Sequence, residues 1–183
     1  MEQRLWNLIR QNDKEALKSL FDQQYDTLLS YGIRLNFSPS EVEDVIQDLF
    51  ISLHDRNKSL PKEVNVQAYL FSAIRFSLFN HRKKTRRFSS LSDQDDAIFL
   101  LEFDDIDADM SMENVQKKLT QLPTRQKEAI YLKYYQNMSI NEIGSIMSIA
   151  PQSVSNLLHK AYVLLRNDLS KQTILQFIWK LQS

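Results

Sequence analysis

Only two of the 183 residues are glycines, Gly32 and Gly144. An average protein has about 7% glycine, because tight turns and phosphate-binding loops need a residue that adopts positive φ without a steric penalty. The shortage argues against a turn-rich β fold, and the glycine-rich dinucleotide and P-loop fingerprints are absent. No stretch alternates apolar and polar residues over the length of a half-buried strand. We therefore predict an all-α fold without a sheet.

The sequence offers little for catalysis or metal binding. It contains no cysteine, which excludes disulfides, thiol chemistry and cysteine zinc sites. The histidines, His54, His81 and His159, fall in separate segments without metal-ligand spacing, and no serine lies in a nucleophile elbow. We expect a protein that is not an enzyme, with no catalytic residue, cofactor, bound metal or small-molecule substrate.

Apolar runs reach about five residues, as in 97–101, whereas a membrane helix needs about 20. The first residues include Glu2, Arg4 and Asn7, where a signal peptide would have an apolar core. We expect no membrane insertion and a cytoplasmic location.

Charge is unevenly distributed, although 23 basic residues balance 23 acidic ones. Residues 61–88 carry seven basic side chains and one acidic, and 114–183 carry nine and three. Between them, 89–113 carries nine acidic side chains and no basic one. Such asymmetry favours a nucleic-acid partner, although clusters on solvated helix faces are the simpler alternative.

The first half of the chain shows three helical segments. Asn12 and Asp13 are placed to cap a helix that runs to about Leu35. Ser38 to Glu41 forms a capping box with proline in the first turn, followed by apolar residues at steps of three and four. A third helix is predicted from Gln67 to about Lys84. Its apolar stripe consists of Leu70, Ala73, Ile74 and Leu78.

Serine and aspartate dominate 89–113, around a short apolar island at 97–101. We interpret this segment as an acidic flexible linker. The prediction is two small helical domains, 1–88 and 114–183, joined by the linker 89–113. In the second domain, apolar residues between 174 and 181 predict an amphipathic C-terminal tail.

The second half contains a helix-turn-helix pattern. A helix from Pro123 to about Tyr135 precedes a turn in which Asn137 is suited to a left-handed backbone. Ser139 and Glu142 then form a capping box for a short helix. After three residues, Pro151 starts a longer helix. Its predicted inward residues are Val154, Leu157, Leu158, Ala161, Leu164 and Leu165.

The outward face of that last helix carries hydrogen-bonding side chains suited to base edges and phosphates in a major groove. These candidate DNA-binding residues are Gln152, Ser153, Ser155, Asn156, His159 and Lys160. The alternative at this level is a helical hairpin that binds no ligand.

Here the sequence resembles a known family. LPTRQKEAIYLKY at 122–134, MSINEIGSIM at 138–147 and VSNLLHKA at 154–161 are similar to region 4 of bacterial extracytoplasmic-function (ECF) sigma factors. SPSEVEDVIQDLF at 38–50, with AYLFSAIR and NHRKK further along, resembles region 2 of the same family. Two features depart from the family pattern. Ser148 stands where glycine is usual. The recognition helix of the family usually carries more arginine, whereas the predicted one has only Lys160 as a basic residue in its first three turns.

The resemblance implies that the helix around 43–53 docks on a coiled coil of the largest polymerase subunit. The residues predicted for this role are Glu43, Asp44, Gln47, Asp48 and Phe50, with Leu49 as a further apolar anchor. Without the resemblance, an ordinary solvated acidic face explains the same carboxylates.

The resemblance also implies opening of the promoter −10 element and capture of a flipped base near the loop 58–67. In the helix that follows, arginines alternate with aromatic residues, as suits a melted strand. The residues predicted to hold that strand are Arg75, Phe76, Phe79, Asn80, Arg82 and Lys83. Core packing of the two phenylalanines is the alternative.

The implied partners are core RNA polymerase, promoter DNA and, as in many family members, an anti-sigma factor. Two other readings remain open from the sequence. One is a helix-turn-helix regulator that acts without entering polymerase, and the other is a helical adaptor whose basic blocks bind acidic proteins.

Overall fold

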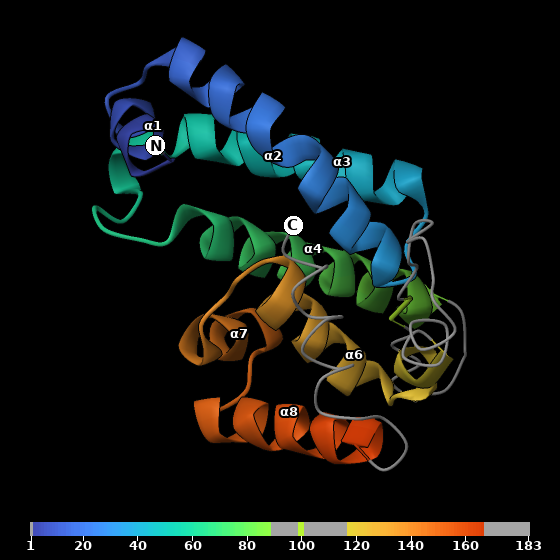
Figure 1. Ribbon diagram of the computed structural model, residues 1–183. Helices are drawn as coiled ribbons and strands as arrows, with labels where there is room; N and C mark the ends of the chain where they lie inside the picture. Colours follow the sequence, from blue (N-terminus) through green and yellow to red (C-terminus); the bar gives the residue numbers. More distant parts are fainter. Residues whose placement is uncertain (1, 89–98, 101–116, 167–183) are drawn as a thin grey trace, which may run out of the picture. The chain divides into compact units, whose positions relative to one another are not determined.

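The computed structural model describes residues 2–88, 99–100 and 117–166 (Figure 1). Within these ranges all regular structure is helical and there is no strand, which confirms the all-α prediction. None of the helices in the same ranges has the length and apolar character needed to cross a bilayer. The chain divides into two compact units, residues 1–96 and 97–183. Apart from Phe99 and Leu100, the predicted acidic linker lies outside the described residues, as does the apolar tail 174–181.

Between residues 2 and 88, the described part of the first unit, there are four α-helices and a short 3-10 turn. They are α1 (Glu2–Arg10), α2 (Lys14–Arg34), α3 (Pro39–Asp55), η1 (Asn57–Ser59) and α4 (Val66–Phe88). The predicted caps are present, because Asp13 accepts a hydrogen bond from the Ala16 N–H at 3.0 Å and Ser38 with Glu41 forms a capping box. The hydrogen bonds from the Ser38 hydroxyl and backbone N–H lower the pKa of Glu41. Helix α1 was not predicted, although its Trp6 is fully buried.

The core of the first unit lies between α2, α3 and α4. Its fully buried side chains include Leu20, Leu28, Tyr31, Ile46, Leu70, Phe71, Ile74 and Leu78. Gly32 lies where α2 meets α3, and a Cβ there would be 2.5 Å from Cγ1 of Val42. The missing side chain therefore lets the two helices approach closely.

The second unit contains α6 (Thr124–Ile130), η2 (Tyr131–Tyr135), α7 (Ile140–Met147) and α8 (Pro151–Arg166), and residues 117–121 are also helical. The helix predicted through Tyr135 is present, but its last turn widens to π geometry, with the Gln136 N–H donating to the Tyr131 carbonyl at 3.2 Å. Phe99, from the predicted apolar island, is fully buried. Its ring centroid lies 5.5 Å from that of Tyr131.

The helix-turn-helix is formed by α7 and α8. The capping box of Ser139 and Glu142 starts α7 as predicted, and Asn137 has the expected positive φ, 53°. Gly144 is needed for the close turn, because a Cβ there would lie 2.8 Å from the Ile149 carbonyl oxygen. Ser148 ends α7 in a left-handed conformation with φ 54°.

On α8, Val154, Leu158, Ala161 and Leu165 are buried as predicted. The prediction that Leu164 is inward is wrong, because its side chain is 46% exposed. The buried residues follow one another at steps of four, three and four, and Leu164 lies at the edge of that stripe.

Ser148→Gly should stabilise the second unit by about 1 kcal/mol, because it removes the steric cost of a left-handed backbone at a residue with a Cβ. The matched control is Ser145→Gly in the same helix, which places glycine in a right-handed helical position and should destabilise it. Hydrogen exchange of the α7 amides in the native protein measures both effects. Equal protection in the two variants would contradict the expected strain at Ser148.

Candidate nucleic-acid and partner interfaces

The outer face of α3 forms a stripe of exposed side chains. Each of these residues lies three or four positions from another on the same side of the helix, and all are exposed: Asp44, Gln47, Asp48, Ile51 and Asp55. Ile51 is 59% exposed, which makes it an apolar side chain surrounded by acidic and amide groups. We call these five residues the α3 stripe.

Three residues predicted for the same interface lie elsewhere on α3. Phe50 is only 6% exposed, and its ring packs edge-on against Phe21 with 5.1 Å between centroids. Phe50 therefore packs in the core of its own unit, and the prediction that it contacts polymerase as an exposed residue is wrong. Glu43 and Leu49 are half-buried, and Glu43 accepts a hydrogen bond from the Tyr25 hydroxyl at 3.3 Å.

Sequence reasoning missed Ile51, although a signal was present. The predicted apolar positions of α3 form one face, and Ile51 is out of phase with them but in phase with Asp44 and Asp48. An apolar residue in phase with charged ones marks an exposed anchor candidate.

Helix α4 presents a second exposed face. Phe76 is 69% exposed, and Asn80 and Lys83 follow at steps of four and three, also exposed. The alternative that Phe76 is a core residue is therefore wrong. Phe79 is half-buried, and its ring meets Phe37 at 85° with 5.7 Å between centroids. The Arg75 guanidinium lies 4.7 Å from the centre of the Phe79 ring.

Arg82 makes contacts within its own unit. Its guanidinium stacks 3.8 Å from the centre of the Phe37 ring and donates to the carbonyl oxygen of Asn36 at 2.7 Å. Asn36 has φ 62° and follows the C-terminus of α2, where a cation complements the helix dipole. Arg82 thus fastens the end of α2 to α4, whereas Lys83 beside it is exposed.

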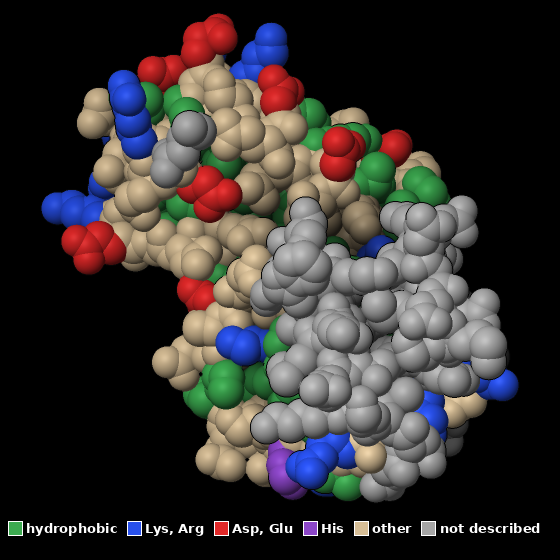
Figure 2. Space-filling model, viewed as in Figure 1, with side chains coloured by type: hydrophobic (Ala, Val, Ile, Leu, Met, Phe, Trp, Pro, Cys, Tyr) green, Lys and Arg blue, Asp and Glu red, His purple; other side chains and the backbone are tan. Residues whose placement is uncertain are grey.

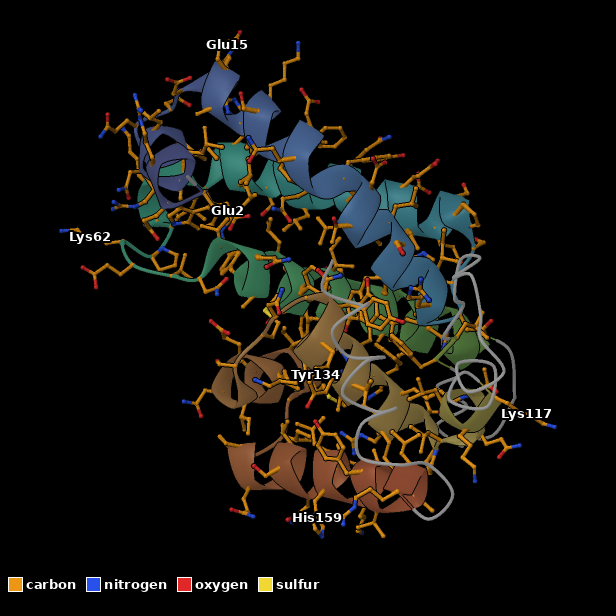
Figure 3. The ribbon with its side chains drawn as sticks, viewed as in Figure 1. Glu2, Glu15, Lys62, Lys117, Tyr134 and His159 are labelled. Carbon is orange, nitrogen blue, oxygen red and sulfur yellow. The ribbon has the colours of Figure 1, made fainter. Side chains whose placement is uncertain are left out.

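The predicted recognition face of α8 is exposed at Gln152, Ser153, Asn156, His159 and Lys160. Figure 3 shows His159 on the outer side of the helix, and Figure 2 shows basic side chains beside it. Gln152 and Asn156 are joined, because the Gln152 amide donates to the Asn156 side-chain oxygen at 3.2 Å. Ser155 is half-buried, and its hydroxyl donates to the Pro151 carbonyl at 3.3 Å.

The sequence matches two protein families in the order that the structure displays. Residues 20–88 match Sigma-70 region 2, and residues 112–165 match Sigma-70, region 4. The first range contains α3 and α4, and the second contains the helix-turn-helix. The two matches together span more than half of the chain, which belongs to the sigma-70 family and is an RNA polymerase sigma factor.

Relatives with similar sequences carry the same description. SigW of Bacillus subtilis (strain 168), an ECF RNA polymerase sigma factor, is 24% identical over 173 residues, which cover 88% of this chain and 92% of SigW. The sigma factor YlaC from the same strain is 20% identical, with 86% and 94% covered. SigL of Mycobacterium tuberculosis (strain H37Rv) is 23% identical, with 85% and 89% covered.

Solved structures share the fold. CnrH, in complex with the cytosolic domain of CnrY, has a TM-score of 0.60 at 16% identity and covers 91% of this chain and 95% of its own. RpoE from Bartonella quintana, in complex with the anti-sigma factor NepR, has a TM-score of 0.58 at 21% identity, with 82% and 94% covered.

Arg82→Lys should destabilise the first unit by roughly 1–2 kcal/mol, because a lysine keeps the charge but loses the planar stack on Phe37 and the aligned bond to Asn36. Lys83→Ala removes an exposed neighbouring charge and should leave the stability unchanged within about 0.5 kcal/mol. Thermal unfolding of both variants compares them directly. If Lys83→Ala were the more damaging change, the structural role of Arg82 would be refuted.

Proposed function

We propose that this sigma factor brings core RNA polymerase to its promoters, with the α3 stripe on the polymerase and exposed faces of α4 and α8 on promoter DNA. The observation that carries the proposal is the presence of region 2 and region 4 in one chain. A helix-turn-helix regulator that acts without polymerase needs only the second of these. The protein itself catalyses nothing in this scheme and works in the cytoplasm, where it meets polymerase.

The α3 stripe is suited to a basic partner. Asp44, Asp48 and Asp55 supply negative charge that speeds and orients association, and Ile51 supplies apolar surface to be buried at the centre. Glu43 contributes indirectly, because its bond with Tyr25 ties α3 to α2.

The DNA contacts divide between the two units. On α4, the exposed Phe76 offers a ring for a base to stack on, and Lys83 offers a charge for phosphate. Arg82 stabilises the position of this face through its contacts with Phe37 and Asn36. On α8, the Gln152–Asn156 pair presents amide groups to base edges in the upstream, −35-like element, and Lys160 contacts the backbone.

An anti-sigma protein is part of the proposal. The similar structures of CnrH and RpoE are complexes with CnrY and with the anti-sigma factor NepR. We infer that a protein of that class restrains this chain as well.

The function is tested by transcription. Purified protein is mixed with core polymerase and a library of genomic DNA fragments from the source organism, and the transcripts are sequenced. Defined start sites that depend on the added protein support the proposal. A protein that binds duplex fragments alone, without such transcripts, would instead be a conventional regulator.

Ile51→Ser should weaken binding to core polymerase roughly tenfold, because it removes the apolar anchor of the α3 stripe. Asp44→Arg with Asp48→Arg should weaken it further through repulsion from a basic partner. Asp22→Arg is the matched control, since Asp22 is exposed on α2 outside the stripe. Interferometry with immobilised core enzyme measures the affinities. Equal affinity of all these variants and the unaltered protein would rule out docking through α3.

Gln152→Ala and Asn156→Ala should each relax base preference at the upstream element, by about 1–3 kcal/mol per lost base contact. Because the two side chains are hydrogen-bonded, the double substitution should cost less than the sum of the single ones. Lys160→Ala should weaken binding to all sequences and reduce its salt dependence. Holoenzyme binding to point-substituted promoter fragments separates these effects. Additive losses at Gln152 and Asn156 would show that they act independently.

A further inference from the structure

Helix α1 lies before the range that matches region 2, which starts at residue 20. One of its faces carries three side-chain donors, Gln3, Trp6 and Arg10, at steps of three and four. Each donates to a backbone carbonyl far along the chain. We call these three residues the α1 splint.

The acceptors are three consecutive carbonyls in the loop between η1 and α4. Arg10 Nε donates to the Leu60 oxygen at 3.0 Å, Trp6 Nε1 to the Pro61 oxygen at 2.8 Å and Gln3 Nε2 to the Lys62 oxygen at 3.0 Å. The helix and the loop therefore run in opposite directions and are matched residue by residue. It is unusual for three consecutive carbonyls of a loop to accept hydrogen bonds from side chains, because the backbone groups of loops more often bond to water.

The loop is held at both of its ends as well. Asn57, buried in η1, donates to the Asn12 side chain at 2.8 Å, and Asn65 accepts from the Ala68 N–H at 3.0 Å at the start of α4. Trp6 also packs edge-on against Tyr69 of α4, with 5.1 Å between centroids. Helix α1 and the residues that follow it therefore contact η1, the loop and α4.

The splint leaves the side chains of the loop outward. Pro61, Lys62, Glu63 and Asn65 are exposed, and Figure 3 shows Lys62 extending away from the body of the unit. Leu60 and Pro61 also line a cavity of about 100 Å³ with Leu49, Ser52, Arg56 and Tyr69. Fixing the carbonyls therefore fixes both the exposed edge of the loop and one wall of this cavity.

We propose that α1 is a positioning element for promoter opening: Gln3, Trp6 and Arg10 hold the loop 60–65 in the conformation that receives the unpaired −10 strand. This inference rests on the proposed function, together with the family resemblance, which implies capture of a flipped −10 base near residues 58–67. The physical gain is preorganisation, since a loop that is ordered before binding loses less conformational entropy when the strand arrives. The splint touches no DNA, so its effect is confined to steps that use the loop.

Three substitutions in the full-length protein test the proposal. Trp6→Phe keeps a ring against Tyr69 but removes the donor to Pro61. Gln3→Met removes the donor to Lys62 from an exposed position, so it does not threaten folding. Arg10→Met removes the donor to Leu60, and Arg4→Met is its control, because Arg4 is an exposed arginine of the same helix.

Two measurements are made on each variant at a temperature well below its unfolding transition. The first is hydrogen exchange of the amides in 62–65. The second uses holoenzyme and a promoter fragment recovered in the transcription experiment, and compares affinity for its single-stranded −10 segment with affinity for the upstream duplex element.

Trp6→Phe with Gln3→Met should speed exchange in the loop and weaken single-strand binding about fivefold to tenfold, with duplex binding unchanged. Arg10→Met should lower the single-strand to duplex ratio, and Arg4→Met should not. An unchanged ratio in the splint variants would overturn the inference, as would an equal fall in both affinities. If the unaltered protein gives no defined transcripts, the proposed function fails instead, a result that is distinct because it precedes any substitution.

Discussion

The close approach of α2 and α3 at Gly32 is the constraint on which the first unit depends. A Cβ at this position would overlap the Val42 side chain, so the crossing exists only because the sequence leaves that volume empty. Val42 lies one turn after Ser38 and directly follows Glu41, and the capping box of Ser38 and Glu41 fixes where α3 begins. The capping box therefore determines where α3 begins, and the contact of Val42 with Gly32 determines how close α3 lies to α2. Everything that the outer face of α3 presents to a partner follows from that placement.

The second unit also contains a close approach at a glycine, but there the neighbouring atom belongs to the backbone and not to a side chain. Gly144 lets the turn after α7 fold back on the helix, and Ser148 accepts a left-handed conformation to do so. Both glycines lie at points of close approach and neither has a positive φ. In the described part of the chain the positive φ angles fall on three asparagines and one serine, Asn12, Asn36, Asn137 and Ser148. Asparagine tolerates this region better than most residues, whereas Ser148 retains strain.

Sequence reasoning found the helices whose signals are local. Caps at Asp13, Ser38 and Ser139 depend on residues three positions away, so they could be read directly from the sequence. It missed α1, whose Trp6 is buried by contacts with residues more than fifty positions later. At the candidate interfaces, sequence reasoning identified suitable types of residue, but it did not separate the buried residues from their exposed neighbours. Phe50 and Ile51 are adjacent and both apolar; the helical phase pointed to Ile51 as the outer one, and the packing of Phe50 against Phe21 shows that Phe50 is the buried one. Arg82 was assigned to DNA because its charge was visible and its bond to Asn36 was not.

The π turn at Tyr131–Tyr135 has a consequence for how chains of this kind vary in length. A π turn accommodates one more residue than an α turn over a similar rise. Its geometry here is closed by the Gln136–Tyr131 backbone bond and by a side-chain bond between the same two residues. A relative that lacks one residue in this stretch would close the helix as an ordinary α turn and still deliver the chain to α7. A single-residue gap in an alignment at this point therefore marks a change of helical winding, with the helix-turn-helix beyond it unaltered.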